Sequence, residues 1–395
     1  MEKEELKDIQ KFALALNEYI EETQGCTKEE RNEKYRLFQT KIQALKCEDF
    51  RFHYHRARFL NSQKDTLSEA KIHIDKSIEL LNQIQDEPTQ VEGNGYFMFL
   101  PPIEGRSFLV SLPPINEQKG KIYFLAGEIY AKIGMQTQSL EYYKKSFYYK
   151  SFLKSEFEEK GTVTVFSFRK FNQFSLADLV NNEITVSPST CMNDPFDSLI
   201  NLWGDEKYLQ KTCNELLHIK PLHDAFSFYR IRCFCIGKGN KPVKNILMWS
   251  HYADEHRGFC IKYKLSNHFY KEDETNENRH MYLKKINYKN VKFNLSAKSI
   301  DSNLAFATKK KDWEYEHEAR LIVYDMNAKA SHYGIPLDAK SKIEAIYFGY
   351  LCPQSTIKTI KNIFVARGAK LPKFYKMMLN PQDVYNLQIE KSLSI

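Results

Sequence analysis

Two patterns of hydrophobic and polar positions divide the chain near residue 160. Before that point, hydrophobic and small residues recur at helical spacing, most clearly over residues 121–146. From residue 161 onward, short runs of β-branched and aromatic residues alternate with turn signals. The pattern predicts an α+β chain, with an all-α domain of helical repeats over residues 1–160 and an α+β domain with a mixed or antiparallel sheet over residues 161–395.

The pattern also predicts individual elements of the second domain. We expect strands at 162–168, 184–187, 227–236, 258–263, 281–288, 319–324, 343–349 and 384–389. Helices are expected from a cap at Ser175 to residue 181, at 209–217, and at 355–366 with Gly368 ending it. Neither a G-x-G-x-x-G motif nor a Walker-type phosphate loop is present, because the glycines at 237 and 239 lack the third glycine and the following helix. This excludes Rossmann and P-loop chemistry.

The helical half resembles a tetratricopeptide array, whose period is about 34 residues. Small and large residues alternate along one repeat unit, at Tyr123, Ala126, Gly127, Tyr130, Gly134, Ser139, Tyr143 and Ser146. The same order recurs upstream, at Tyr54, Ala57, Ala70, Ile74 and Ser77. A Pro/Gly-rich insertion at 87–118 is expected to interrupt the array. The resemblance implies a surface that binds a peptide or partner protein, and the alternative is that these helices only support the second half.

Composition and charge place limits on the partners. The net charge is +8, from 58 Lys and Arg against 50 Asp and Glu, and residues 279–311 hold nine basic residues against one acid. Such a run favours a phosphate-rich or nucleic-acid contact, or forms an ordinary solvated face. No stretch of the sequence is apolar enough for a secretion signal or a membrane span, and the eight cysteines show no C-x-x-C spacing. We therefore expect a cytoplasmic protein without a bound metal.

Four groups of residues follow one another in the second half: FRKF at 168–171; SPS at 187–189 with NDPFD at 193–197; MWSHYA at 248–253 with GFC at 258–260; and DWEYEHEAR at 312–320. The order and the residues of these motifs resemble those of a bacterial family catalogued as domain of unknown function 2971, and the resemblance covers residues 161–390. More distantly, the layout is similar to the ADP-ribosyltransferase fold.

That second resemblance implies NAD as the substrate and a role for each group. Arg169 would clamp the cofactor, Ser187 and Ser189 would form the second-strand element, and Glu316 or Glu318 would be the catalytic carboxylate, with Glu314 not separated from them. His251 is a candidate general base. Further cofactor contacts are expected from four more residues: Trp249, Ser250, Tyr252 and Arg320. The setting that the resemblance suggests is a toxin or a phage-defence effector.

Several alternatives stay open at this point. On a helix, Glu316 and Arg320 would form a surface pair four residues apart, with no chemistry. Trp249 is equally expected in the core, with His251 packed beside it. Two other functions fit the same residues: a non-enzymatic sensor with a nucleotide-like ligand, and a metal-dependent phosphodiesterase or nuclease that uses Asp194 and the basic run.

Overall fold

The computed structural model of this chain describes residues 25–63, 65–83, 115–150, 161–192, 220–269, 279–289, 306–328, 332–368 and 370–390, with 96–99, 109–112, 157, 197 and parts of 8–23. It divides into two compact units, Met1–Phe152 with Thr212–Ala225, and Leu153–Lys211 with Phe226–Ile395. The helix predicted at 209–217 and most of the insertion predicted at 87–118 lie outside the described residues.

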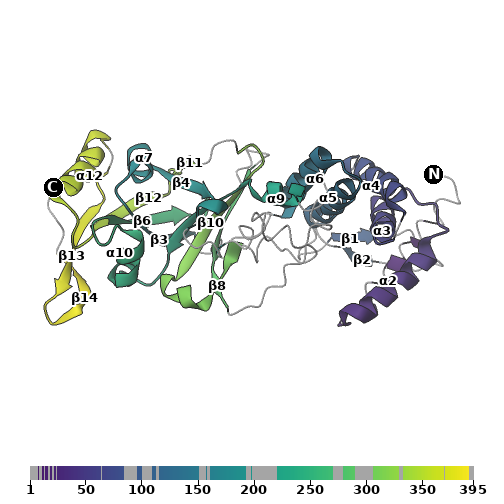
Figure 1. The fold of residues 1–395 in the computed structure, drawn as a ribbon, viewed down its shortest axis with the longest axis horizontal. Helices are drawn as coiled ribbons and strands as arrows, with labels where there is room; N and C mark the ends of the chain where they lie inside the picture. The colour runs from purple at the N-terminus through teal and green to yellow at the C-terminus, as the bar shows by residue number, and fades with distance from the viewer. Residues whose placement is uncertain are drawn as a thin grey trace. The chain divides into compact units, whose positions relative to one another are not determined.

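The first unit is built mainly of helices, as its periodicity predicts. Helix α3 packs on α4, α4 on α5 and α5 on α6, and a short antiparallel pair, β1 with β2, lies between α4 and α5 in the sequence (Figure 1). The bounds are α2 Lys28–Ile42, α3 Phe50–Leu60, α4 Leu67–Asn82, β1 Tyr96–Phe99, β2 Leu109–Leu112, α5 Ile115–Lys132 and α6 Gln136–Lys150. The tetratricopeptide assignment and the partner-binding role stay predictions.

Small residues set the spacing of these helix pairs. A side chain at Gly127 would place its Cβ 2.7 Å from the ring of Tyr143, so only glycine allows α5 and α6 this close. Buried serines then bond across the pairs: Ser146 Oγ donates to the Gly120 carbonyl at 2.7 Å, and Ser77 Oγ donates to the Phe50 carbonyl at 2.7 Å. The two pairs α3–α4 and α5–α6 therefore share one packing device, which accounts for the echo between the two sequence segments.

The second unit contains a ten-stranded mixed sheet, and the predicted α+β class is confirmed. The strand order is β11-β4-β5-β3-β6-β12-β13-β14, with β10 on the other edge of β5 and β7 beyond it; β12 and β13 are parallel. The bounds are β3 Thr162–Arg169, β4 Glu183–Pro188, β5 Tyr229–Cys235, β6 Phe259–Ser266, β7 Arg279–Lys285, β10 Glu318–Asp325, β11 Tyr333–Pro336, β12 Lys342–Phe348, β13 Lys373–Asn380 and β14 Asp383–Ile389.

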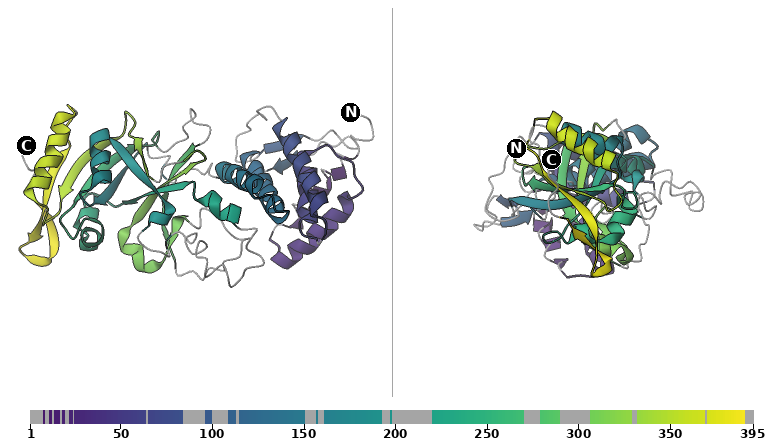
Figure 2. Two further views of the ribbon diagram at one scale, coloured as in Figure 1. Left: turned by 45° about the horizontal axis from the view of Figure 1, so that its top comes forward. Right: turned by 90° about the vertical axis from the view of Figure 1, so that its left-hand side faces the viewer.

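Every predicted strand overlaps an observed one, but two strands of the ten-stranded sheet, β11 and β13, were not predicted, and neither was the two-residue strand β9 (Thr308–Lys309), which pairs with β8 (Asn287–Tyr288). Strand β11 is four residues long and contains Gly334 and Pro336, residue types that weaken a strand signal. Strand β13 lacks a regular alternation of buried and exposed residues, and it pairs with β14 in a hairpin beside α12 (Figure 2).

Helices cover both faces of this sheet. Helices α7 (Gln173–Asn181) and α12 (Gln354–Ala366) pack on one face, and α10 (Ile246–Tyr252) on the other (Figure 1). The prediction that Ser175 caps α7 is wrong. Asn172 is the cap, and Ser175 is the third residue of the helix, whose side chain bonds back to Asn172 in a capping box. Among the described residues, no helix is long and apolar enough to cross a bilayer.

Candidate functional site

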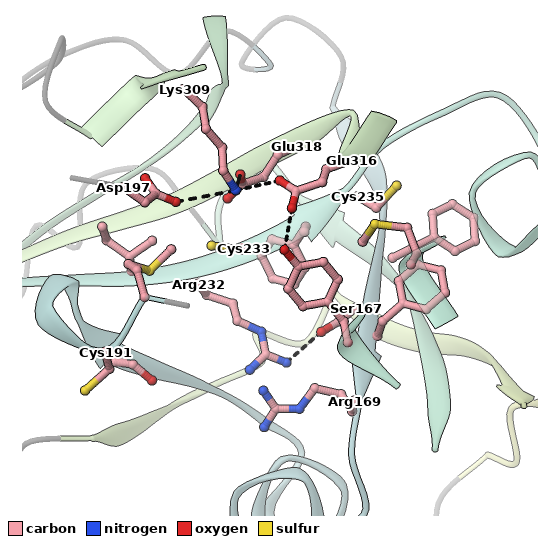
Figure 3. A pocket seen from close by; sticks show the side chains of 18 residues that line it. Ser167, Arg169, Cys191, Asp197, Arg232, Cys233, Cys235, Lys309, Glu316 and Glu318 are labelled. Carbon is pink, nitrogen blue, oxygen red and sulfur yellow. Dashed lines mark hydrogen bonds and ion pairs between the residues drawn. The ribbon is translucent and has the colours of Figure 1, made fainter. Parts of the chain in front are cut away.

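The sheet opens where β3 and β4 diverge along one edge of β5. Strand β5 pairs with β4 at Arg230 and Ile231 and with β3 at Cys235, so its residues between these points pair with neither strand in the described register. The other edge of β5 is paired with β10 over its whole length. A pocket with a cavity volume of about 200 Å³ lies at this opening (Figure 3).

Side chains from both faces of the sheet line this pocket. Residues opposite one another in a strand pair share a face. Arg169 is opposite Phe259, which packs with α7 and α12, whereas Glu318 is opposite Cys235, which packs with α10. The two predicted site residues therefore belong to opposite faces, yet both line the pocket, because the opening between β3 and β4 connects the faces.

One end of the pocket is a buried cluster of charges around Lys309. Its ammonium lies 2.6 Å from Glu316 Oε2, 3.4 Å from Glu318 Oε2 and 3.5 Å from Asp197 Oδ2. Arg320 completes the cluster, with Nε 2.6 Å from Glu318 Oε1 and Nη2 2.6 Å from Asp197 Oδ2. All five side chains are almost fully buried, so each charge depends on its neighbours. Figure 3 shows Lys309 with Asp197, Glu316 and Glu318 around its ammonium.

The backbone around residue 317 brings the two glutamates onto the same ammonium. Glu316 ends a 3₁₀ helix, η7 (Lys311–Glu316), and Glu318 begins β10. His317 between them is left-handed, with φ +43°, a conformation that costs energy for a residue with a side chain. Glu316 and Arg320 therefore do not share a helix, and the alternative of a surface Glu316–Arg320 pair four residues apart is wrong.

The two glutamates differ in their proton affinity. Burial raises the pKa of Glu316, and the opposing effect of Lys309 does not cancel it. Burial also acts on Glu318, but Arg320 and Lys309 outweigh it and lower the pKa of Glu318 to about 2. Glu318 is therefore a permanently charged partner of Arg320, while Glu316 is the pocket carboxylate whose protonation is adjustable.

Tyr252 connects α10 to this cluster. Its hydroxyl lines the pocket and donates a hydrogen bond to Glu316 Oε1. Burial, and next to it the charge of Glu316, raise the pKa of Tyr252, so the phenol stays a donor. The helix is fixed by its cap, Asn245, which accepts from the Leu247 amide and donates to the Tyr315 carbonyl of η7. Glu316 is thereby held from two sides, by Tyr252 and by Lys309.

The other end of the pocket holds two guanidinium groups. Arg232 Nη2 lies 3.2 Å from Asp178 Oδ2 and donates to Ser167 Oγ at 2.8 Å. Arg169 Nη2 lies 3.4 Å from the same Asp178 oxygen. Figure 3 shows the guanidinium groups of Arg169 and Arg232 next to each other. Burial and the neighbouring Arg232 lower the pKa of Arg169 to about 10. Asp178 is itself locked, because its other oxygen accepts from the amide and hydroxyl of Thr185.

Of the ten predicted site residues, five line the pocket: Arg169, Ser187, Tyr252, Glu316 and Glu318. Arg320 is not among the lining residues and acts through Glu318 and Asp197. Ser189 is buried in a 3₁₀ turn and does not line the pocket. Asp194, which the nuclease alternative uses, lies outside the described residues.

Three predicted residues of the MWSHYA segment have other environments. Trp249 is fully buried, packs edge-on against Phe168, and donates its indole N–H to the Val243 carbonyl, so it is a core residue and offers no face to a ligand. The segment is a helix, and Ser250 does not line the pocket; its Oγ contacts His256 Nε2 at 3.2 Å. His251 is exposed and contacts the Tyr315 hydroxyl, and it does not line the pocket.

Sequence reasoning missed several residues of this site, among them the cations Arg232 and Lys309. Arg232 stands in a strand whose other residues are mostly hydrophobic, and a buried arginine there was a usable signal. Lys309 was counted in the basic run 279–311, of which residues 290–305 lie outside the described part. In the structure Lys309 is buried among carboxylates, so it does not belong to a solvated face. Over the described ranges, no group of three or more His, Cys, Asp or Glu could hold a metal ion.

Comparison with known proteins adds one finding to this geometry. Residues 248–321 match a family model described as "Protein of unknown function (DUF2971)". The match runs from α10 into β10 and so includes Tyr252, Lys309, Glu316 and Glu318. A search of curated proteins and a search of solved structures each gave no match. The resemblance predicted from the motifs is therefore confirmed over residues 248–321, which match the model of this family.

Proposed function

We propose that the second unit consumes NAD, as an enzyme of ADP-ribosyltransferase or NAD glycohydrolase type. The observation that carries this proposal is the separation of charge along one pocket. Among the described residues, the Lys309 cluster has three carboxylates against two cations, an excess of one negative charge when all are ionised. The other end has two guanidinium groups against the single carboxylate of Asp178, an excess of one positive charge.

NAD has the complementary arrangement of charge. Its diphosphate is anionic and its nicotinamide ring is cationic, so each end of the pocket attracts a different part of the molecule. The pocket wall also includes Phe166, Phe168 and Met248, which supply apolar contacts for rings. Arg169 lies at the guanidinium end, where the resemblance places a cofactor clamp.

The reaction needs a negative charge where Glu316 lies. The bond between ribose C1′ and the nicotinamide nitrogen breaks, and its electron pair neutralises the ring, which leaves as nicotinamide. Positive charge then develops at C1′, and a fixed carboxylate in a buried site stabilises it without reorganising. Water, or a nucleophilic group of an acceptor, bonds to C1′ and releases a proton. Glu316 is the carboxylate we assign to this role, because both oxygens of Glu318 are paired with the guanidinium of Arg320, whereas Glu316 Oε1 accepts from the neutral phenol of Tyr252.

The direct test incubates the purified full chain with NAD and separates the products by chromatography. We expect free nicotinamide together with ADP-ribose or an ADP-ribosylated acceptor, at a rate above that of a sample without protein. A chain that binds NAD by calorimetry but releases no nicotinamide, with or without candidate acceptor proteins, would be a sensor and would contradict the proposal.

The pH dependence of this reaction should change in Tyr252→Phe. The Tyr252 hydrogen bond favours the charged form of Glu316, so its loss raises the pKa of that carboxyl further. Because the ionised form is the active one, the rate falls as the pH drops through this pKa. The acidic limb of kcat should therefore move to higher pH, by about one pH unit.

Tyr315→Phe is the matched control for this experiment. Tyr315 also bonds through its hydroxyl, but to the exposed His251, and it does not line the pocket. Its acidic limb should coincide with that of the unaltered chain. An unshifted limb in Tyr252→Phe, measured as a full pH–rate profile, would show that Glu316 does not carry the titration.

A further inference from the structure

The guanidinium end of the pocket contains a buried donor that the described part of the chain leaves unused. Arg232 is 6 % exposed and lines the pocket, and its Nε has no hydrogen-bond partner among the described residues. An unsatisfied N–H of a buried guanidinium at the wall of a pocket calls for an acceptor that is not part of the chain.

The charges at this place specify what that acceptor is. Arg169 and Arg232 both approach one carboxylate oxygen of Asp178, and like charges held so close are unfavourable without a second anion. Both guanidinium groups also line the pocket, so a bound group can reach them. Arginine side chains present a planar fork of N–H donors that matches the oxygens of a phosphate. A diphosphate offers enough oxygens and charge to occupy both forks.

We infer that Arg232, together with Arg169, forms a diphosphate-binding site, with Arg232 as its fixed inner member. This inference deepens the proposed function, on which its identification of the NAD diphosphate rests. The division of roles follows from the contacts. Arg232 is held by Ser167 Oγ and Asp178, whereas Arg169 contacts Asp178 alone among the described residues and its side chain is 18 % exposed. Arg169, the more exposed of the two, contacts the ligand from the solvent side.

The test measures binding and needs no catalysis. The ligands are ADP, adenosine and inorganic pyrophosphate, titrated into the full chain by calorimetry. We expect ADP and pyrophosphate to bind and adenosine to bind more weakly than ADP. Arg232→Lys should lose about 10-fold to 100-fold of the ADP affinity, because lysine keeps the charge but not the fork. If pyrophosphate alone binds, the site recognises free diphosphate and not a nucleotide, and the NAD assignment is overturned.

Arg230→Lys is the matched control. Arg230 lies two residues away on the same face of β5, is 5 % exposed, and donates to the backbone carbonyls of Ser227 and Tyr229. The Arg230→Lys chain should bind ADP with an affinity within about twofold of that of the unaltered chain. Equal losses in Arg230→Lys and Arg232→Lys would mean a general disturbance of β5 and overturn the inference, as would an unchanged ADP affinity in folded Arg232→Lys.

Arg169→Gln covers the case in which Arg232→Lys does not fold. Its side chain is partly exposed and has one partner, so the variant should fold and still lose ADP affinity. Unchanged binding there would again contradict the site. Because ADP has no nicotinamide bond to break, ADP binding without NAD cleavage would refute the proposed function and leave the diphosphate site standing.

Discussion

Glu316→Gln should reduce the rate of nicotinamide release from NAD by about 100-fold to 1,000-fold, with the chain still folded. The change removes the negative charge next to C1′ and keeps the shape of the side chain. Both neighbours can be kept: the amide oxygen accepts from Lys309, and the amide N–H donates to the Tyr252 oxygen. The remaining cluster then has two carboxylates and two cations, so the substitution removes no charge balance on which the fold depends.

Glu314→Gln is the matched control for this prediction. Glu314 belongs to the same 3₁₀ helix, but it is exposed and does not line the pocket. Its nicotinamide release should equal that of the unaltered chain. Initial rates at saturating NAD, with far-UV circular dichroism of each variant, decide the matter. A Glu316→Gln chain that keeps its rate would remove Glu316 from the chemistry and leave the proposal without a catalytic group.

The sheet of the second unit was predictable because most of its strands are runs of seven or eight residues rich in β-branched and aromatic side chains, with turn signals between them. Strands β3, β5 and β10 have hydrophobic residues on both faces of the sheet, and the few charged residues among them are what distinguishes one strand from another. Arg169, Tyr252 and Glu316, which the motifs singled out, line one pocket. They are far apart in the sequence: β3 and β10 both pair with β5, which brings Arg169 at the end of β3 near the η7–β10 segment, and α10 adds Tyr252 through its contact with Glu316.

The rest of the site depends on packing that local sequence does not encode. Trp249 looks like a stacking residue, and only the fold shows that Phe168 and the Val243 carbonyl enclose it. Lys309 looks like part of a basic surface until the fold places three carboxylates around it: Glu316 at the end of η7, Glu318 at the start of β10, and Asp197. The opening between β3 and β4 arises from long-range register, so no window of sequence predicts it.

Arg320→Met should destabilise the second unit by about 3–5 kcal/mol. Arg320 has no exposed surface and bonds to Glu318 on both oxygens, to Asp197 and to the Phe306 carbonyl. Methionine fills much of the volume but leaves Lys309 as the only described cation facing the three carboxylates of the cluster. The unfolding of this unit can be followed separately, because all three tryptophans, at 203, 249 and 313, lie in residues 153–395. Their emission during denaturant unfolding gives the stability change.

Two further measurements identify the unpaired carboxylates as the cause. In the unaltered chain the pKa of Glu318 is about 2, so its stabilising contribution is complete above the ordinary glutamate range and is lost only as the pH falls toward 2. Without Arg320, burial raises that pKa instead, and the charged form destabilises the variant increasingly as the pH rises. The gap between Arg320→Met and the unaltered chain should therefore narrow from pH 7.5 to about pH 5. The double variant Arg320→Met/Glu318→Gln should recover part of the loss at pH 7.5. A gap independent of pH, with no recovery in the double variant, would assign the loss to packing around residue 320 and not to the charge cluster.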